Sequence, residues 1–139
     1  MSKALHRYRK LDRLLNYVTR LIQVLLKVEG ASVIFLDADK KEFFFHTVSY
    51  EDTAVGRKLI PIRFPVDKGV AGKVYQTGRP LVVADYAKCP YAYKKVDEQV
   101  QYDTRNLLDV PLRIKERMIG ILRAVNKRDG AFDQEDIEL

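Results

Sequence analysis

The sequence predicts an α+β fold in which helices pack on an antiparallel sheet, and three observations lead to this prediction. The chain has 139 residues, the usual size of one domain, and 47% of them are hydrophobic, which is enough to fill a core. An amphipathic helix pattern opens the chain. Pairs of apolar, β-branched segments separated by short polar turns follow it, and such hairpins imply antiparallel strands.

Residues 1–30 are the first part of the predicted organisation and contain an amphipathic helix. Apolar residues recur at spacings of three, four and seven, with charged and polar residues between them. Gly30 is expected to end this helix as a C-cap. The stripe is wide, so it faces the sheet of its own chain, a second copy of the helix, or both. It consists of Leu11, Leu14, Leu15, Val18, Leu21, Ile22 and Leu25.

A hairpin and a third strand are predicted next. Residues 31–36 form an apolar run, and turn residues separate this run from the aromatic and β-branched segment 42–50, so the two segments should pair. Residues 51–57 are polar and contain a glycine, which predicts a loop. Residues 58–64 alternate enough apolar side chains to predict a strand.

The second half of the chain continues with shorter elements. Residues 69–78 have the pattern of a short helix closed by glycine, and a short strand at 81–84 follows it. Residues 85–102 are polar, rich in tyrosine and form the longest connection, a kind of segment that often carries function. Two strands, 106–114 and 117–126, are expected to pair across a tight turn.

The chain stops where a last helix has only begun. Asp133 has the character of an N-cap, and Glu135 and Asp136 favour the positive end of the helix dipole. Only three residues follow Asp136. We therefore expect residues 31–139 to be the core of a domain from a longer protein, with the C-terminal helix truncated.

The composition argues against several classes of protein. The single cysteine, Cys89, cannot form an internal disulfide, and two histidines without spaced carboxylates predict no metal site. No nucleophile and base set or phosphate loop is present, so we expect no enzyme. The net charge of +6 is spread along the chain without a nucleic-acid-binding motif, so no nucleic-acid partner is expected. Without a signal peptide pattern or an apolar run long enough for a membrane, we expect a cytoplasmic location and no membrane partner.

A series of motifs in this chain resembles that of GAF domains. The motifs are GVAGKV at 69–74, TGRP at 77–80, TRNLLDVPL at 104–112, IGIL with VNK at 119–127, and FDQED at 132–136. Each motif alone is weak, but their order and spacing together are specific, and the resemblance extends from about Leu11 to the C-terminus. It implies a GAF-like, PAS-related fold, with the terminal helices on one face of a central antiparallel sheet and a ligand pocket on the other.

The resemblance also implies a function. GAF domains of this kind are small-molecule sensors that regulate an output domain in the same chain, and their terminal helices often form a homodimeric bundle. The apolar stripe of the first helix suits such a dimer interface. The similarity is strongest to the cyclic-nucleotide-binding GAF domains of phosphodiesterases and adenylyl cyclases. The alternative is a degenerate GAF domain that acts only in dimerisation or protein interaction, with a pocket filled by its own side chains. The tyrosines of the long connection would fill it, namely Tyr86, Tyr91, Tyr93 and Tyr102.

Two sets of residues follow from this resemblance. Asn126, Lys127, Phe132 and Asp136 match a signature of the subgroup, in which Ile137 replaces a glutamate. In the family this motif ties a strand to the last helix, so its role here is expected to be structural. Residues aligned with nucleotide-contacting positions are Tyr93, Asp97 and Thr104, together with Val70 and Ala71, whose backbone at a helix start suits an anion.

Two further positions affect the identity of the ligand. Tyr50 is the candidate aromatic to stack on a flat ring. Arg123 stands where the family places an acidic residue directed at the base, and a guanidinium donates hydrogen bonds and accepts none, which disfavours cGMP. We expect a cyclic nucleotide or another anion as the ligand. No bilin or haem is expected, because Pro90 and not histidine follows Cys89, and free-methionine-sulfoxide reductases of this fold need at least two cysteines.

Overall fold

The computed structural model describes residues 3–138 of the chain. Six strands form one sheet in the order β3-β2-β1-β6-β5-β4, and every neighbouring pair is antiparallel, which confirms the predicted α+β class. The elements are α1 (Lys3–Leu25), β1 (Val28–Asp37), β2 (Glu42–Tyr50), α2 (Thr53–Leu59), β3 (Arg63–Pro65), α3 (Gly69–Thr77), β4 (Leu81–Val83), the 3₁₀ turn η1 (Tyr86–Lys88), α4 (Lys94–Val100), β5 (Leu107–Ile114), β6 (Arg117–Lys127) and α5 (Gln134–Glu138).

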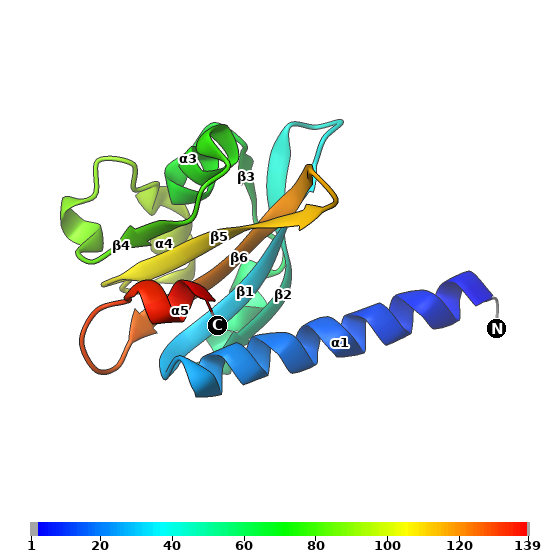
Figure 1. The fold of residues 1–139 in the computed structure, drawn as a ribbon, viewed down its shortest axis with the longest axis horizontal. Coiled ribbons are helices and arrows are strands. Elements are labelled where there is room, and N and C mark those ends of the chain that lie inside the picture. Colours follow the sequence, from blue (N-terminus) through cyan, green and yellow to red (C-terminus); the bar gives the residue numbers. More distant parts are fainter. Residues whose placement is uncertain (1–2, 139) are drawn as a thin grey trace.

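Helices cover both faces of the sheet (Figure 1). On the first face α1 crosses β1 and β2, and α5 lies beside the C-terminal part of α1. On the second face α2, α3 and α4 pack over the strands. The first face buries Leu26, Val28, Leu108, Ala124 and Phe132, and the second buries a larger cluster that includes Ile34, Phe43, Phe45, Val74, Val100 and Ile121.

The predicted hairpin of the first two strands is confirmed. The β1–β2 register runs from Gly30 opposite Tyr50 to Asp37 opposite Glu42, with an irregularity after Val33. The irregularity leaves one extra residue in β2, as in a β-bulge. The hairpin forms one half of the sheet together with β3, and β1 joins this half to β6.

The predicted end of the first helix is wrong. Gly30 does not cap α1, because it lies inside β1, whereas α1 ends at Leu25 and the chain turns at Lys27, which has a φ of 56°. The need for glycine at position 30 comes from packing. A Cβ atom there would lie 2.6 Å from the ring of Tyr50, so only glycine leaves room for this ring.

The predictions for residues 51–64 are also wrong, because the expected loop contains α2 and the expected strand shrinks to β3. Asp52 caps α2 by accepting a hydrogen bond from the amide of Ala54 at 3.0 Å. Val55 and Leu59, four residues apart, are then buried against the sheet on one side of the helix. The buried side of this helix is a single turn, which is too short to produce a clear helical pattern in the sequence.

The remaining elements lie close to the positions predicted from the sequence. Gly78 closes α3 in the left-handed conformation, with a φ of 71°. The long connection contains η1 and α4, and α4 buries Val96 and Val100 against the sheet. Asp133 caps α5, since its carboxylate accepts a hydrogen bond from the amide of Asp136 at 3.1 Å. None of the helices within the described residues is both long enough and apolar enough for a membrane crossing.

Candidate functional site

A buried ion pair lies at the centre of the second face of the sheet. Asp109 of β5 and Arg123 of β6 are register partners, so their side chains share this face. The Nε and Nη2 atoms of Arg123 donate to the two carboxylate oxygens of Asp109 at 2.7 and 2.8 Å. Asp109 is fully buried and the Arg123 side chain is 16% exposed. Burial opposes the charge of Arg123, but the ion pair outweighs this and raises its pKa, so the guanidinium stays charged.

Tyrosine side chains surround this ion pair. Tyr50 comes from the end of β2, Tyr86 from η1 and Tyr102 from the segment after α4. Burial raises the pKa of Tyr50 to about 12, and burial likewise raises the pKa of Tyr86 and of Tyr102. The rings of Tyr50 and Tyr102 meet edge to face, with centroids 5.3 Å apart. The wall of the site therefore consists of neutral aromatic side chains that carry hydroxyl groups.

Asp97 of α4 is the carboxylate of this site whose hydrogen bonding is incomplete. Its Oδ1 accepts a hydrogen bond from the Thr104 hydroxyl at 3.0 Å. Its Oδ2 is buried and has no hydrogen-bond partner among the described residues. Burial raises the pKa of Asp97, and the nearby hydroxyl groups of Tyr86 and Thr104 offset this only in part. Buried polar atoms are rarely left without a partner in native proteins, so this oxygen is a candidate ligand contact.

Two hollows meet at this carboxylate. An inner cavity of about 20 Å³ lies against Arg123 of the ion pair and has room for roughly one water molecule. An outer pocket of about 440 Å³ lies at the surface beside α4. Four residues line both hollows and form the wall between them, namely Tyr86, Asp97, Tyr102 and Thr104. A movement of this wall would join the two hollows into one site.

The structure brings together four of the seven residues predicted to bind a ligand. Tyr50, Asp97, Thr104 and Arg123 all line the inner cavity. The cavity is nearly closed in this structure, with Tyr86 and Tyr102 taking up the space beside them.

The other three predicted residues lie outside this cavity. Val70 and Ala71 are buried at the start of α3 in two different apolar clusters. Tyr93 precedes α4, and its ring stacks on Phe64 at 6.3 Å between centroids. These residues support the position of α3 and α4 over the sheet.

Asp109 is the residue of the site that the sequence reasoning missed. A carboxylate between Leu108 and Val110 in a predicted strand was the available signal, since such a residue is buried on one face and needs a partner. Tyr86 and Tyr102 belong to the tyrosines that the alternative function expects to fill the pocket, and both line the inner cavity. The pairing of Asp109 with Arg123 also means that this arginine has no uncompensated charge for an anion.

A hydrogen-bond network ties the segment after α4 to the sheet. Asn126, fully buried with a φ of 58°, donates from Nδ2 to the Tyr102 hydroxyl and to the carbonyl of Asp103, both at 2.9 Å. Its Oδ1 accepts from the amide of Arg105 at 2.7 Å. Tyr102 in turn donates to Glu29 at 2.7 Å. Burial would raise the pKa of Glu29, but hydrogen bonds from Tyr102, Asn126 and Arg105 lower it below its ordinary value.

The other signature residues lie on the first face, away from the cavity. The Lys127 ammonium group lies 2.6 Å from the Asp136 carboxylate and 5.9 Å from the centre of the Phe132 ring. Asp136 also accepts a hydrogen bond from the amide of Asp133. These contacts join the end of β6 to α5 and put no group into the candidate site.

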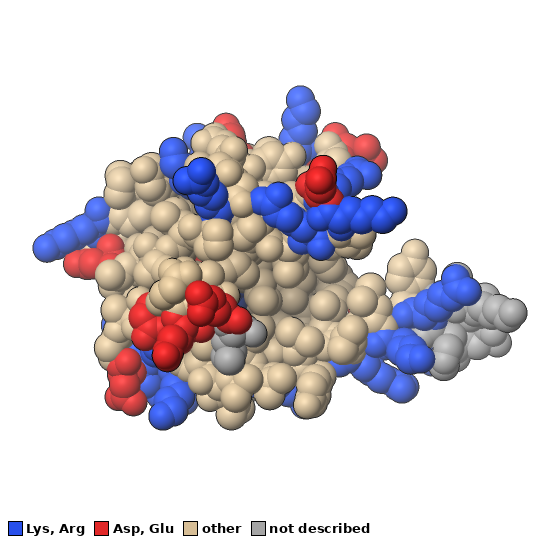
Figure 2. All heavy atoms as spheres, viewed as in Figure 1, with Lys and Arg blue, Asp and Glu red and all other residues tan. Residues whose placement is uncertain are grey.

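The apolar stripe of α1 is divided between the sheet and solvent. Leu15, Val18 and Ile22 are half-buried on the sheet side. An apolar groove of about 250 Å³ lies between α1 and α5. The surface between these two helices carries few charged side chains (Figure 2). The exposed members of the stripe are Leu11, Leu14, Leu21 and Leu25, with exposed fractions of 44%, 56%, 40% and 52%.

The fold and this arrangement correspond to a known family. The family model for the GAF domain matches residues 9–139, so the chain belongs to the GAF domain family. GAF domains are regulatory domains of the small-molecule-sensing type, and this chain is one of them.

Similar sequences occur in cyclic phosphodiesterases. The chain is 29% identical to the probable 3',5'-cyclic phosphodiesterase pde-5 of Caenorhabditis elegans, over 91% of this chain and 18% of that protein. It is 34% identical to the cone cGMP-specific 3',5'-cyclic phosphodiesterase subunit alpha' of Bos taurus, over 67% of this chain and 11% of that protein. The chain thus spans less than a fifth of the length of either relative.

Solved structures share the fold at lower identity. The GAF domain of a phosphoenolpyruvate-protein phosphotransferase from Coxiella burnetii superposes with a TM-score of 0.79 at 18% identity, over 91% of this chain and 73% of that one. The free methionine-R-sulfoxide reductase of Neisseria meningitidis, solved with its substrate, superposes with a TM-score of 0.70 at 20% identity, over 90% and 68%. At these identities the likeness concerns the fold alone.

Proposed function

We propose that this GAF domain binds a small polar ligand on the second face of the sheet, beneath the segment 85–106, and so regulates an output domain of a longer cytoplasmic signalling protein. The observation that carries this proposal is the buried Oδ2 atom of Asp97, which lacks a partner among the described residues and lies in the wall between the two hollows. A ligand that donates a hydrogen bond to this oxygen would remove the cost of burying it unpaired.

Among the expected ligand classes, a cyclic nucleotide matches these groups better than a simple inorganic anion. The base has N–H donors for Asp97 and a flat ring for the tyrosine wall. The outer pocket is within the size range of small-molecule sites. A simple inorganic anion has no ring for the tyrosine wall, and the arginine that it would meet is already neutralised by Asp109. The relatives' names, which refer to cyclic phosphodiesterases, support the same choice.

The proposed mechanism is a shift between closed and open forms of the wall. In the closed form Tyr86 and Tyr102 separate the hollows, and Asn126 holds the following segment on the sheet. A ligand that prefers the open form would move this segment relative to β5 and β6, whose other face packs against the terminal helices. The shift would be limited by the ligand's difference in affinity for the two forms.

The test is a thermal-shift and calorimetric titration of the purified domain with cGMP and cAMP. A ligand at a hundred times its dissociation constant stabilises the folded state by about 2.7 kcal/mol. We expect this stabilisation to be lost in Asp97→Asn and Thr104→Val. Asp85→Asn is the matched control, because Asp85 is an exposed carboxylate of the same segment that lines neither hollow. Binding that survives both site variants would place the ligand elsewhere.

A second candidate function is a dimerisation module without a ligand. The specific observation in its favour is the size of the inner cavity, about 20 Å³, because the domain's own tyrosine side chains occupy the predicted pocket. The exposed leucines of α1 would then form the interface of a homodimer. Absence of any stabilisation by the nucleotides, together with a stable dimer in solution, would favour this function over the first.

A further inference from the structure

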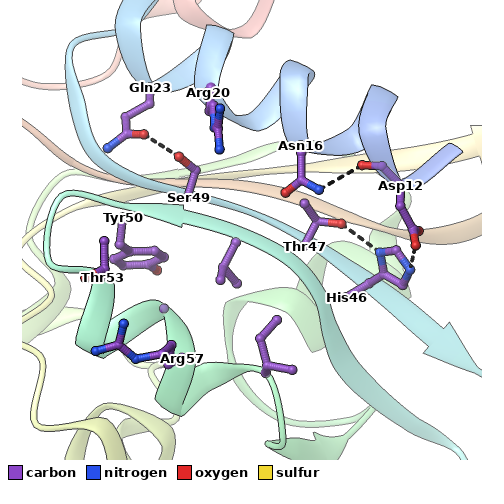
Figure 3. Close-up of a pocket in the computed structure, with 13 residues that line it drawn as sticks. Asp12, Asn16, Arg20, Gln23, His46, Thr47, Ser49, Tyr50, Thr53 and Arg57 are labelled. Carbon is purple, nitrogen blue, oxygen red and sulfur yellow. Dashed lines mark hydrogen bonds and ion pairs between the residues drawn. The ribbon is translucent and has the colours of Figure 1, made fainter. Parts of the chain in front are cut away.

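A groove of about 640 Å³ lies between α1 and α2 at the edge of the sheet (Figure 3). Its floor consists of five consecutive residues of β2, 46–50. Successive side chains of a strand point to opposite faces of the sheet. A floor of consecutive residues therefore runs along the edge of the strand, where the backbone is accessible from the side.

This edge of β2 has no strand partner within the described part of the chain. The neighbouring strand β3 pairs with β2 only at residues 42–44. On the side of β2 that faces β1, the amide of Glu51 donates a hydrogen bond to the carbonyl of Glu29 at 2.9 Å. Because backbone groups alternate in an antiparallel ladder, those of Ser49 and Thr47 point toward β1, and those of Val48 and Tyr50 point into the groove. Unpaired groups of this kind are a template for another strand.

The walls of the groove match the length of a short strand. One wall is the polar side of α1, from Asp12 to Gln23, which spans about 16 Å at 1.5 Å per residue. The five residues of the β2 edge span about 13 Å from the first to the last Cα atom. The groove therefore has room for an extended segment of about five residues that lies along the edge of β2, between α1 and α2.

The charges of the groove favour an acidic occupant. The groove is lined by two arginines and one carboxylate, Asp12, which lies 3.4 Å from His46. Arg20 of α1 and Arg57 of α2 form no ion pair with any residue that the structure describes. They come from the two opposite walls, one above and one below the strand (Figure 3). A second copy of the same edge would bring the same two arginines against them, which disfavours pairing between copies.

We propose that this groove binds an extended acidic peptide segment by strand addition to the free edge of β2. The peptide backbone would pair with the outward amide and carbonyl groups of Val48 and Tyr50. Its carboxylates would lie between Arg20 and Arg57. The site is separate from the ligand site beneath 85–106, and Tyr50 is the residue that lines both.

Fluorescence polarisation with three labelled hexapeptides tests this proposal. The first alternates Glu and Val, the second replaces each Glu by Lys, and the third keeps the Glu–Val sequence but is methylated at alternate backbone nitrogens. We expect saturable binding of the first peptide alone. Arg20→Gln and Arg57→Gln should each weaken it about fivefold to tenfold, the usual effect of losing one charge contact. Arg13→Gln is the control, since Arg13 is exposed on α1 but does not line the groove.

Hydrogen exchange of the Val48 amide gives a second readout, and we expect the first peptide to slow it. Equal binding of the methylated peptide would overturn strand addition, and equal binding of the lysine peptide would overturn the role of the arginines. Displacement of the acidic peptide by inorganic sulfate at similar concentration would assign the arginines to a small anion and overturn the proposal. So would the absence of saturable binding at about 1 mM peptide.

Discussion

Asp97 combines a role in the proposed site with a cost to the stability of the domain. Burial raises its pKa in the folded state, so the folded domain favours the protonated carboxyl group. Its contribution to stability is therefore complete below the ordinary pKa of an aspartate and is lost as the pH rises through the raised value. Above the raised pKa the ionised group lies buried with one oxygen unpaired.

Asp97→Asn should therefore stabilise the free domain at pH 7, by about 1 kcal/mol, because the amide carries no charge and keeps an oxygen for the Thr104 hydroxyl. The gain should shrink toward zero as the pH falls to about 4, the ordinary pKa of an aspartate, because the folded wild-type carboxyl group takes up its proton above that value. Denaturant unfolding at both pH values measures this difference. The same gain in Asp85→Asn, an exposed position, would show that the loss of a negative charge from this segment, and not burial, is responsible.

The Asp109–Arg123 pair affects stability in a different way, since both charges are buried and each compensates the other. Arg123→Met should destabilise the fold by about 3–5 kcal/mol, because it leaves the carboxylate of Asp109 buried without its cation. Adding Asp109→Leu to the same chain should recover most of that loss, since a well-packed apolar pair can replace a buried ion pair. A double-mutant cycle from denaturant unfolding measures the coupling. A double variant no more stable than the single one would mean that the pair also supports the neighbouring tyrosine wall.

At the scale of elements, Asn126 decides how firmly the segment 102–106 is held on β6. Asn126→Ala removes four hydrogen bonds to this segment and puts alanine, which tolerates the left-handed conformation less well than asparagine, at a φ of 58°. We expect the free energy of unfolding to fall by about 2–4 kcal/mol. The Arg105 amide, which donates to Asn126, should exchange its hydrogen much faster.

Asn126→Gly separates the two causes in that prediction. Glycine accepts the positive φ without strain but makes no side-chain hydrogen bonds. Equal exchange at Arg105 in the alanine and glycine variants would assign the effect to the lost hydrogen bonds. Unchanged exchange in the glycine variant would instead show that the segment is held by other contacts, such as the packing of Tyr102 on Tyr50.

Elements with a long or repeated pattern could be predicted from the sequence, and short ones could not. The hairpin of β1 and β2 and the helix α3 closed by Gly78 emerged from their spacing. The helix α2 did not, because its single buried turn depends on the Asp52 cap and on contact with the sheet. Gly30 carried a helix-end signal, although its actual role is to admit the ring of Tyr50 from another strand.

The candidate site shows the same limit for tertiary contacts. Family alignment led to four residues of the cavity wall, including Asp97 and Arg123. It did not lead to Asp109, because the strand register, and not sequence spacing, places this carboxylate opposite Arg123. The near closure of the cavity by Tyr86 and Tyr102 depends on how the whole connection packs, which a pattern of residues does not encode.

At the scale of the whole molecule, the two faces of the sheet have different partners. The second face is covered by the domain's own helices, whereas the first leaves an apolar groove and the exposed leucines of α1 beside α5. Exposed apolar patches of this kind are typical of interaction surfaces. We therefore expect a homodimer in which the exposed side of α1 packs against its copy.

Light scattering coupled to size exclusion measures this expectation. Leu14→Asp and Leu21→Asp should convert the dimer to a monomer, because each places a charge at the centre of the apolar contact. The fold should tolerate these changes, since both side chains are exposed in the single chain. Asn16→Asp adds the same charge on the opposite side of α1 and should leave the dimer intact. Dissociation by Asn16→Asp, or a dimer that survives both leucine variants, would place the interface on another surface of the domain.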